Sequence, residues 1–274
     1  MTVRLAKLHA TGNDFLVAEA PGPDPGSVAG LCDRHRGIGA DGLLVLGPGT
    51  AGADCSMTLY NADGTPAEMS GNGVRCLAWV AVARGLGNDG TLVVDTTVGR
   101  RAVDLDRDAS GQLRAATVDM GTVTFEPGAI PFSGPTALDL DVTYHGVTYH
   151  GDAAGIGNPH LVLLVDDVDT ARVTQHGPHL EHDRRFPAGT NVEFVTPVGR
   201  DELRMRVWER GVGETLSCGT GACAAAAVAH RRGLVDERVT VHVPGGDLDV
   251  ILGRTVRLGG PVTHVFDVDV PAAP

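Results

Sequence analysis

Residues 208–223 read WERGVGETLSCGTGAC. A strand-like run ends at Glu209 and Arg210, a glycine-rich turn follows, and Cys218 stands directly before Gly-Thr-Gly. The alanine-rich residues 222–230 favour a helix, so the pattern predicts Cys218 at or just before a helix N-terminus. The free N–H groups and dipole there favour an anion, and we therefore expect a lowered thiol pKa and a competent base or nucleophile. The alternative is a small buried cysteine at a tight turn.

This stretch has a counterpart in the first half of the chain. SGNG at 70–73 opens an apolar run that ends in RGL at 84–86, and CGTG at 218–221 opens one that ends in RGL at 232–234. Two further pairs follow in the same order, GNDFLV with GNPHLV and GAD with GTN, starting at residues 12, 157, 39 and 189. Offsets of about 145 to 150 residues are far longer than a solenoid repeat and indicate a duplicated half-chain.

Composition and charge limit the class of protein. The chain has 274 residues, enough for one large or two moderate domains. Its net charge of −12 argues against nucleic acid or an anionic membrane as a partner. We expect no signal peptide or membrane anchor, because charges interrupt the N-terminus by Arg4 and Lys7. Five cysteines without regular spacing suit reduced thiols and a cytoplasmic location better than a disulfide framework.

The periodicity predicts an α/β fold of the α+β type, with two similar domains. We expect the domains near residues 1–118 and 119–262, and a tail at 263–274 that returns to the first sheet. Each half holds several strands and one long apolar helix, which a sheet must surround to hide its side chains. Between residues 168 and 182 we expect a short helix that breaks at Gly177 and Pro178.

Motifs for cofactors and metals are absent or incomplete. Each Gly-x-Gly is only part of a dinucleotide fingerprint, because the third glycine is missing, and no Gly-Lys-Ser/Thr phosphate loop occurs. His176, His179 and His182 are three residues apart, but the expected break would prevent their alignment. The sequence therefore predicts neither a metal site nor a cofactor.

The motifs together resemble those of the diaminopimelate epimerase family. They are HATGNDF at 9–15, NADG at 61–64 with SGNG, GNPH at 157–160, GTNVEF at 189–194, and WERGVGET at 208–215 with CGTG. The resemblance covers nearly the whole chain in order. It implies two pseudo-symmetric domains, each a mixed sheet curled around a central helix, with the active site in the cleft between them. It also implies a cytoplasmic homodimer without pyridoxal phosphate or metal, which converts LL-2,6-diaminopimelate to the meso form in lysine and peptidoglycan precursor biosynthesis.

The same resemblance assigns roles to residues. Ser70 and Cys218 take the places of the paired acid and base, one on each face of the α-carbon. Gly71, Asn72, Gly219 and Thr220 would hold the reacting carboxylate. His160 is a weaker, supporting candidate. The residues that would hold the rest of the substrate are Asn13, Asn61, Asn158, Asn191, Glu209 and Arg210.

Two positions depart from the family. The family has cysteine at both helix starts, whereas the first position here is Ser70, and Gly42 stands where many relatives have a ligand-contacting amide. A hydroxyl is a far weaker acid than a thiol, whose ordinary pKa is roughly 8.5. Three hypotheses therefore stand: an epimerase in which Ser70, directly or through water, serves one face; a related racemase, epimerase or dehydratase; and a binding protein without catalysis. We favour the first, because the residues expected to hold the substrate all persist.

Overall fold

The computed structural model describes residues 2–87 and 89–271. The chain forms two compact units, one made of residues up to Asp119 and from Gly259 onward, the other of Met120–Leu258. The boundaries lie one and four residues from those expected at 118/119 and 262/263. Two strands carry the chain between the units: β8 (Leu113–Gly121) and β17 (Val256–Pro261).

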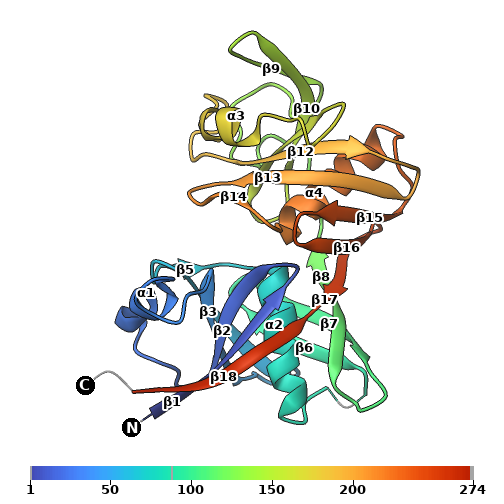
Figure 1. Cartoon of the computed structure of the whole chain (residues 1–274). Helices are drawn as coiled ribbons and strands as arrows, with labels where there is room; N and C mark the ends of the chain where they lie inside the picture. The colour runs from blue at the N-terminus through green and yellow to red at the C-terminus, as the bar shows by residue number, and fades with distance from the viewer. Residues whose placement is uncertain (1, 88, 272–274) are drawn as a thin grey trace. The chain divides into compact units, whose positions relative to one another are not determined.

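The first unit is built from strands and two α-helices (Figure 1). Its other elements are β1 (Thr2–Ala10), β2 (Asn13–Glu19), the 3-10 turn η1 (Pro25–Ser27), α1 (Val28–Cys32), β3 (Gly42–Pro48), β4 (Cys55–Asn61), β5 (Pro66–Ala67), α2 (Gly71–Ala83), β6 (Thr91–Thr96), β7 (Gly99–Arg107) and β18 (Thr263–Pro271).

The second unit has corresponding elements in nearly the same order. They are β9 (Leu140–Tyr144), β10 (Val147–Gly155), β11 (Pro159–Leu164), α3 (Val173–Leu180), β12 (Asn191–Pro197), β13 (Glu202–Glu209), β14 (Gly213–Thr215), α4 (Gly219–Arg231), β15 (Arg238–Val243) and β16 (Gly246–Ile251). The exception is β9, which stands at the start of the unit, whereas β18, which pairs with β1 as β9 does with β10, ends the chain.

The two sheets share one topology. In the first unit, β1–β2, β3–β4 and β6–β7 are antiparallel pairs, joined by the parallel pairs β2–β3 and β4–β6. In the second unit, β10–β11, β12–β13 and β15–β16 are antiparallel, and β11–β12 and β13–β15 are parallel. A short strand pairs with the fourth strand of each series, β5 with β4 and β14 with β13. The repeat in the sequence is therefore a repeat of topology, and the predicted fold class is confirmed.

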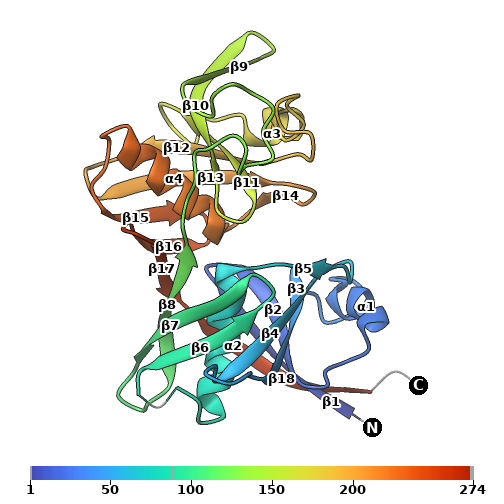
Figure 2. The ribbon, with the colours of Figure 1, turned by 180° about the vertical axis from the view of Figure 1, so that it is seen from behind.

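One buried helix lies within the curl of each sheet. In Figure 1 strands surround α2, which contacts β1 to β4, and Figure 2 shows α4 among the strands of its own unit. Most residues of both helices, from Val74 to Val82 and from Ala222 to Ala229, are small or β-branched and buried. An apolar helix of this kind buries its surface on all sides only when a sheet wraps around it. Among the described residues, no helix has the length and apolar character needed to cross a membrane.

The tail of the chain completes the first sheet. β18 runs antiparallel to β1, and their pairing extends from Thr2 opposite Pro271 to His9 opposite Thr263. β1 therefore lies between β2 and β18, as the sequence predicts for the tail.

The predicted break at Gly177 and Pro178 is wrong, because α3 continues through both residues to Leu180. Proline removes one N–H donor near the end of this short helix. The helix packs against β13, where a Cβ atom at Gly177 would lie 2.6 Å from Cγ of Trp208. The indole Nε1 of Trp208 donates to Glu181 at 2.8 Å, directly after the helix. These tertiary contacts outweigh the local cost of the proline.

Gly177→Ala should therefore destabilise the second unit by roughly 1–3 kcal/mol, the usual cost of forcing an extra carbon into a packed interface. The indole would have to move to admit the new carbon. Gly30→Ala in α1 is the matched control, because a Cβ atom there meets nothing within 4 Å and alanine favours a helix. Urea unfolding of both variants measures the difference. Equal stabilities would show that the contact with Trp208 imposes no constraint.

Candidate active site

Cys218 is the N-cap residue of α4, as predicted. Its backbone is extended, with φ −123° and ψ 110°, and its Sγ accepts a hydrogen bond from the Gly221 N–H at 3.4 Å. Glycine at 219 and 221 leaves the first turn of the helix without bulky side chains. The residue is only 5% exposed. The motif therefore places a thiol at the N-terminus of a helix, where the backbone N–H groups favour an anion.

The expected lowering of the Cys218 pKa is wrong. Burial raises the pKa of this thiol well above its ordinary value, and the nearby carboxylates of Glu209 and Glu193 raise it further. The Thr220 hydroxyl and the Gly221 N–H act in the opposite direction but do not compensate. The helix N-terminus thus meets two acidic side chains that the local motif does not reveal. Cys218 is held as a protonated thiol, which is the acid form of an acid–base group.

Glu209 is the carboxylate partner of this thiol. It ends β13, accepts a hydrogen bond from the Thr215 hydroxyl across the β13–β14 turn, and also hydrogen-bonds with Cys218. Burial raises the pKa of its carboxyl, although these hydrogen bonds counteract the rise. A partly enclosed carboxyl with a raised pKa can receive the proton when the thiol ionises.

A second group of polar side chains reaches Cys218 from β11 and β12. Nδ1 of His160 lies 2.7 Å from Oε1 of Glu193, and Nε2 lies 2.9 Å from Oδ1 of Asn158. Asn158 donates from Nδ2 to the Thr220 hydroxyl at 3.4 Å, and that hydroxyl lies 3.5 Å from Sγ of Cys218. His160 and Glu193 are both fully buried. Three predicted site residues and the unpredicted Glu193 thus form one hydrogen-bonded series that ends at the thiol.

Asn191 and Arg210 lie together at the edge of this unit. Oδ1 of Asn191 accepts from the backbone N–H of Arg210 at 3.0 Å, and its Nδ2 donates to the Pro159 carbonyl at 3.0 Å. The buried amide therefore ties the end of β13 to the start of β11. The guanidinium of Arg210 is exposed and donates only weakly, to the Ala188 carbonyl at 3.4 Å. A planar guanidinium of this kind can form two parallel hydrogen bonds with a carboxylate.

In the first unit, Ser70 is the N-cap residue of α2. Its Oγ accepts from the Gly73 N–H at 3.0 Å, the same bond that Sγ of Cys218 makes with Gly221. The two helix starts are therefore equivalent in geometry and differ in one atom, oxygen for sulfur. A serine hydroxyl needs a base to act in proton transfer, because its own pKa is far from neutral.

A series of amides supports the first helix start. Nδ2 of Asn72 donates to Oδ1 of Asn13 at 3.2 Å, and Nδ2 of Asn13 donates to the Asp41 carboxylate at 2.7 Å. At the other end, the buried guanidinium of Arg75 donates to Oδ1 of Asn72. An anion at one end and a cation at the other set which way both amides point. Two predicted substrate-binding residues are thus oriented by two residues that were not predicted.

The carboxylate of Asp14 stabilises the loop that contains Asn13. Burial alone would raise the pKa of its carboxyl, but hydrogen bonds from Arg34 and Lys7 lower it to about 2. Arg34 also donates to Asp41 at 2.7 Å and so joins Asp14 to the amide series. Lys7 and Arg34 thus hold the two carboxylates at this loop, and one of these, Asp41, accepts the hydrogen bond from Asn13.

Asn61 and Gly42 face each other across the β3–β4 pair. The Asn61 amide is exposed and donates to the Thr65 hydroxyl at 3.0 Å, within its own turn. At Gly42, a Cβ atom would lie 2.5 Å from the Tyr60 carbonyl oxygen. No larger side chain fits there without a shift of the backbone.

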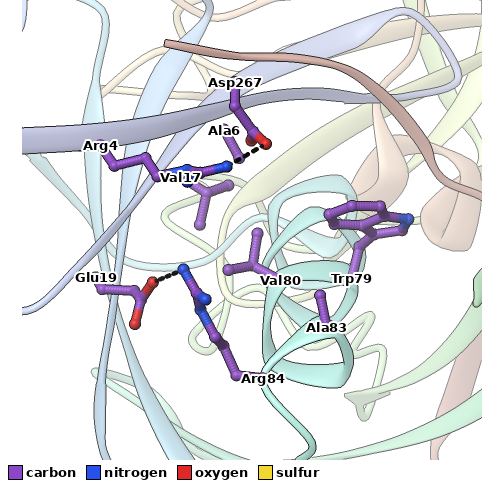
Figure 3. A pocket seen from close by; sticks show the side chains of 9 residues that line it. All are labelled: Arg4, Ala6, Val17, Glu19, Trp79, Val80, Ala83, Arg84 and Asp267. Carbon is purple, nitrogen blue, oxygen red and sulfur yellow. Dashed lines mark hydrogen bonds and ion pairs between the residues drawn. The ribbon is translucent and has the colours of Figure 1, made fainter. Parts of the chain in front are cut away.

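A pocket in the first unit lies away from Ser70. Figure 3 shows it beside the last turns of α2, bordered by Trp79 and Arg84, with one ion pair between two strands and one between a strand and the end of the helix. Its other lining residues are Arg4, Ala6, Val17, Glu19, Val80, Ala83 and Asp267. The ion pairs join Arg4 to Asp267 and Arg84 to Glu19. The guanidinium groups of this pocket are therefore paired with carboxylates.

Three site residues escaped the sequence analysis: Glu193, Asp41 and Arg75. Two carried a usable signal, because Glu193 and Arg75 are single charges inside otherwise apolar elements. Asp41 is the repeat counterpart of Asn191, which the motif comparison did select. Across residues 2–87 and 89–271, no three His, Cys, Asp or Glu side chains gather as a metal site. His176 instead hydrogen-bonds the Tyr149 hydroxyl at 2.8 Å.

Comparison with known proteins identifies the family. The family model for diaminopimelate epimerase matches residues 5–126 and 153–261. A diaminopimelate epimerase from Moorella thermoacetica is 41% identical over 98% of this chain and 99% of its own, and one from Synechocystis is 39% identical over 97% and 98%. The fold is shared more widely. A hydroxyproline epimerase from Agrobacterium vitis superposes with a TM-score of 0.72 at 17% identity, over 98% of this chain and 92% of that one.

A phenazine biosynthesis protein of the PhzF family from Bacillus anthracis superposes with a TM-score of 0.73 at 13% identity, over 99% of both chains. Likenesses this distant establish the fold alone. The match of the family model and the near full-length identity to curated relatives establish more: this chain belongs to the diaminopimelate epimerase family.

Proposed function

We propose that this chain epimerises LL-2,6-diaminopimelate to the meso form at one α-carbon, without pyridoxal phosphate or metal, in lysine and peptidoglycan precursor biosynthesis. The family assignment supports the reaction. The observation that carries the mechanism is the pair of equivalent N-cap residues, Ser70 and Cys218, each at the start of a buried helix. Inversion at carbon needs one proton donor and one acceptor on opposite faces, and the two units supply one such residue each.

The substrate carboxylate is proposed to bind backbone N–H groups at the two helix starts. Gly71 and Asn72 contribute from α2, and Gly219 and Thr220 from α4. These donors also stabilise the negative charge that spreads into the carboxylate as the α-proton leaves. Arg210, with Asn13, Asn61, Asn158 and Asn191, is proposed to hold the remaining polar groups and to select a diacidic diamine over ordinary amino acids.

The proposed proton transfers follow from the protonation state of each residue. Cys218 delivers its proton to the α-carbon, and the original α-proton leaves on the opposite face through the Ser70 hydroxyl to a solvent water molecule, which accepts it. In the reverse direction Glu209 receives the thiol proton, and the thiolate becomes the base. The C–H bond broken on one face is matched by the C–H bond formed on the other, so no oxidant or cofactor is required.

Incubation with LL-diaminopimelate in deuterated water tests the proposal. The expected result is deuterium at one α-carbon together with the meso product. Tight binding without exchange would identify a binding protein instead. Loss of a β-substituent with release of an imine or keto product, from a substrate that carries one, would identify a dehydratase.

The chain is further proposed to work as a cytoplasmic homodimer. Val265 and Phe266 on β18, at the edge of the first sheet, are 51% and 42% exposed, and an edge strand presents unpaired backbone groups that can pair with a second chain. Sedimentation at micromolar concentration measures the mass. A monomer at every concentration would contradict this part of the proposal.

Asp41→Ala should lower kcat/KM for diaminopimelate by about 10–100-fold, the effect of losing a charge-assisted hydrogen bond worth roughly 1.5–3 kcal/mol. Asn13 and Asn72 would then lose the anion that orients their amides. Steady-state kinetics measures the effect. Asp95→Ala is the control, since it removes a carboxylate paired with Arg100 in the same unit but outside the amide series. A variant with wild-type kinetics would show that Asp41 does not orient these amides.

A further inference from the structure

Glu193 and His160 form a charged or chargeable pair in the interior of the second unit. They lie on adjacent parallel strands, and each is fully buried. One oxygen of Glu193 faces Nδ1 of His160 at 2.7 Å, and the other has no hydrogen-bond partner within the described part of the chain. Buried ionic pairs are costly, and apolar residues of similar volume are often at least as stable. Packing alone therefore does not account for this pair.

The carboxylate fixes the protonation of the imidazole ring. An ionised carboxylate only accepts hydrogen bonds, so Nδ1 must carry a proton. Nε2 lies 2.9 Å from Oδ1 of Asn158, an amide oxygen that only accepts, so the hydrogen bond there requires a proton on Nε2 as well. A carboxylate that orients an imidazole in this way is a common feature of sites where histidine takes part in proton transfer. The ring in turn holds the Asn158 side chain, whose Nδ2 reaches the Thr220 hydroxyl.

Glu193 also lies against the start of α4. A Cβ atom at Gly221 would be 2.7 Å from Oε1 of Glu193 and 3.2 Å from Sγ of Cys218. Gly221 is therefore what allows the carboxylate and the thiol to approach the same turn of the helix. The titratable groups near Cys218 are Glu209 from β13, Glu193 from β12 and His160 from β11. The negative charge of Glu193 helps to keep the thiol protonated.

We infer that Glu193 is a positioning residue of the epimerase, which holds a proton on Nδ1 of His160, orients the ring, and thereby positions the Asn158 and Thr220 side chains beside Cys218. This inference rests on the proposed function. It assigns to Glu193 no contact with substrate, and it places the effect of the residue on the proton-transfer step rather than on binding.

Glu193→Gln tests the inference, because glutamine keeps the shape but is uncharged and can donate to Nδ1, so that Nδ1 need no longer carry a proton. We expect kcat to fall by roughly 10–100-fold, the effect of losing a charge-assisted hydrogen bond, with KM changed by less than about threefold. The rate of Cys218 alkylation by iodoacetamide should also rise at lower pH than in the wild type. Glu202→Gln is the control, an exposed carboxylate at the start of β13, and should leave both readouts unchanged.

Nitrogen-15 spectra of wild-type protein provide a reading that needs neither substrate nor a variant of Glu193. The His160 signal, assigned by its loss in His160→Gln, should show a protonated Nδ1 at neutral pH. A bare Nδ1 would overturn the inference, as would a folded Glu193→Gln variant with wild-type kcat and alkylation profile. Should the wild-type protein fail to epimerise diaminopimelate, the proposed function would fall, whereas the alkylation and nitrogen-15 results would still decide the role of Glu193.

Discussion

Cys218→Ala should reduce epimerisation of LL-diaminopimelate by at least about 100-fold, since positioned acid–base groups contribute roughly 10²–10⁴-fold to such rates. Alanine leaves the helix start in place but removes the only proton carrier at this N-cap. The deuterium assay measures the loss on each face separately. We expect exchange from the face served by Cys218 to disappear, and net inversion to disappear with it.

Cys223→Ala is the matched control for this variant. Cys223 lies on the same helix, one turn beyond Gly219, and is fully buried in the core. Its loss should affect stability and leave the chemistry intact. Iodoacetamide should inactivate the wild type progressively faster as the pH rises, because burial and the two carboxylates keep the Cys218 thiol protonated. Full activity in Cys218→Ala would place the proton carrier elsewhere.

Ser70→Cys should raise turnover by about tenfold or more, since acid–base efficiency improves as the pKa of the group approaches the working pH. Sulfur would stand where Oγ now accepts the Gly73 N–H, in the geometry already seen at Cys218. In the wild type, exchange should be asymmetric, and the face served by Cys218 should take up deuterium first. The variant should show less imbalance between the two stereoisomers.

Two comparisons make this result specific. Ser27→Cys places a thiol at another helix start in the same unit, where the present side chain makes no capping bond, and should not change turnover. Ser70→Ala reports how much the hydroxyl already contributes. Equal exchange from both isomers in the wild type, with no gain in Ser70→Cys, would mean that another group already activates Ser70 or serves its face.

Local rules predict the elements of this protein well, and its electrostatics poorly. The helix starts at the Gly-x-Gly motifs of α2 and α4 follow from the identities of a few neighbouring residues. The repeat between the halves is visible directly as matching motifs in the sequence. The pKa of Cys218 cannot be predicted from its neighbours in this way. The two carboxylates that raise it are distant in sequence, because Glu193 lies 25 residues before Cys218 and Glu209 precedes β14. The helix N-terminus alone favours a thiolate, and only the tertiary fold supplies the burial and charge that reverse the direction.

The same distinction explains the other errors and omissions. Proline at 178 predicts a break by local sterics, but Trp208 packs on Gly177 and stabilises the helix. Arg75 appears in the sequence as an unexplained charge within an apolar helix, and its role with Asn72 emerges only when the loop at Asn13 is in place. Sequence motifs select residues that meet a ligand more readily than residues that orient them.

The antiparallel pairing of β1 with β18 constrains the order in which the chain can fold during synthesis. Met120–Leu258 is continuous, so the second unit has all its strands once those residues have left the ribosome. The first unit must wait, because β1 gains its second neighbour only when Thr263–Pro271 has been made. The half that is translated first is therefore the half that is completed last, and until then β1 presents an unpaired edge open to non-native strand pairing.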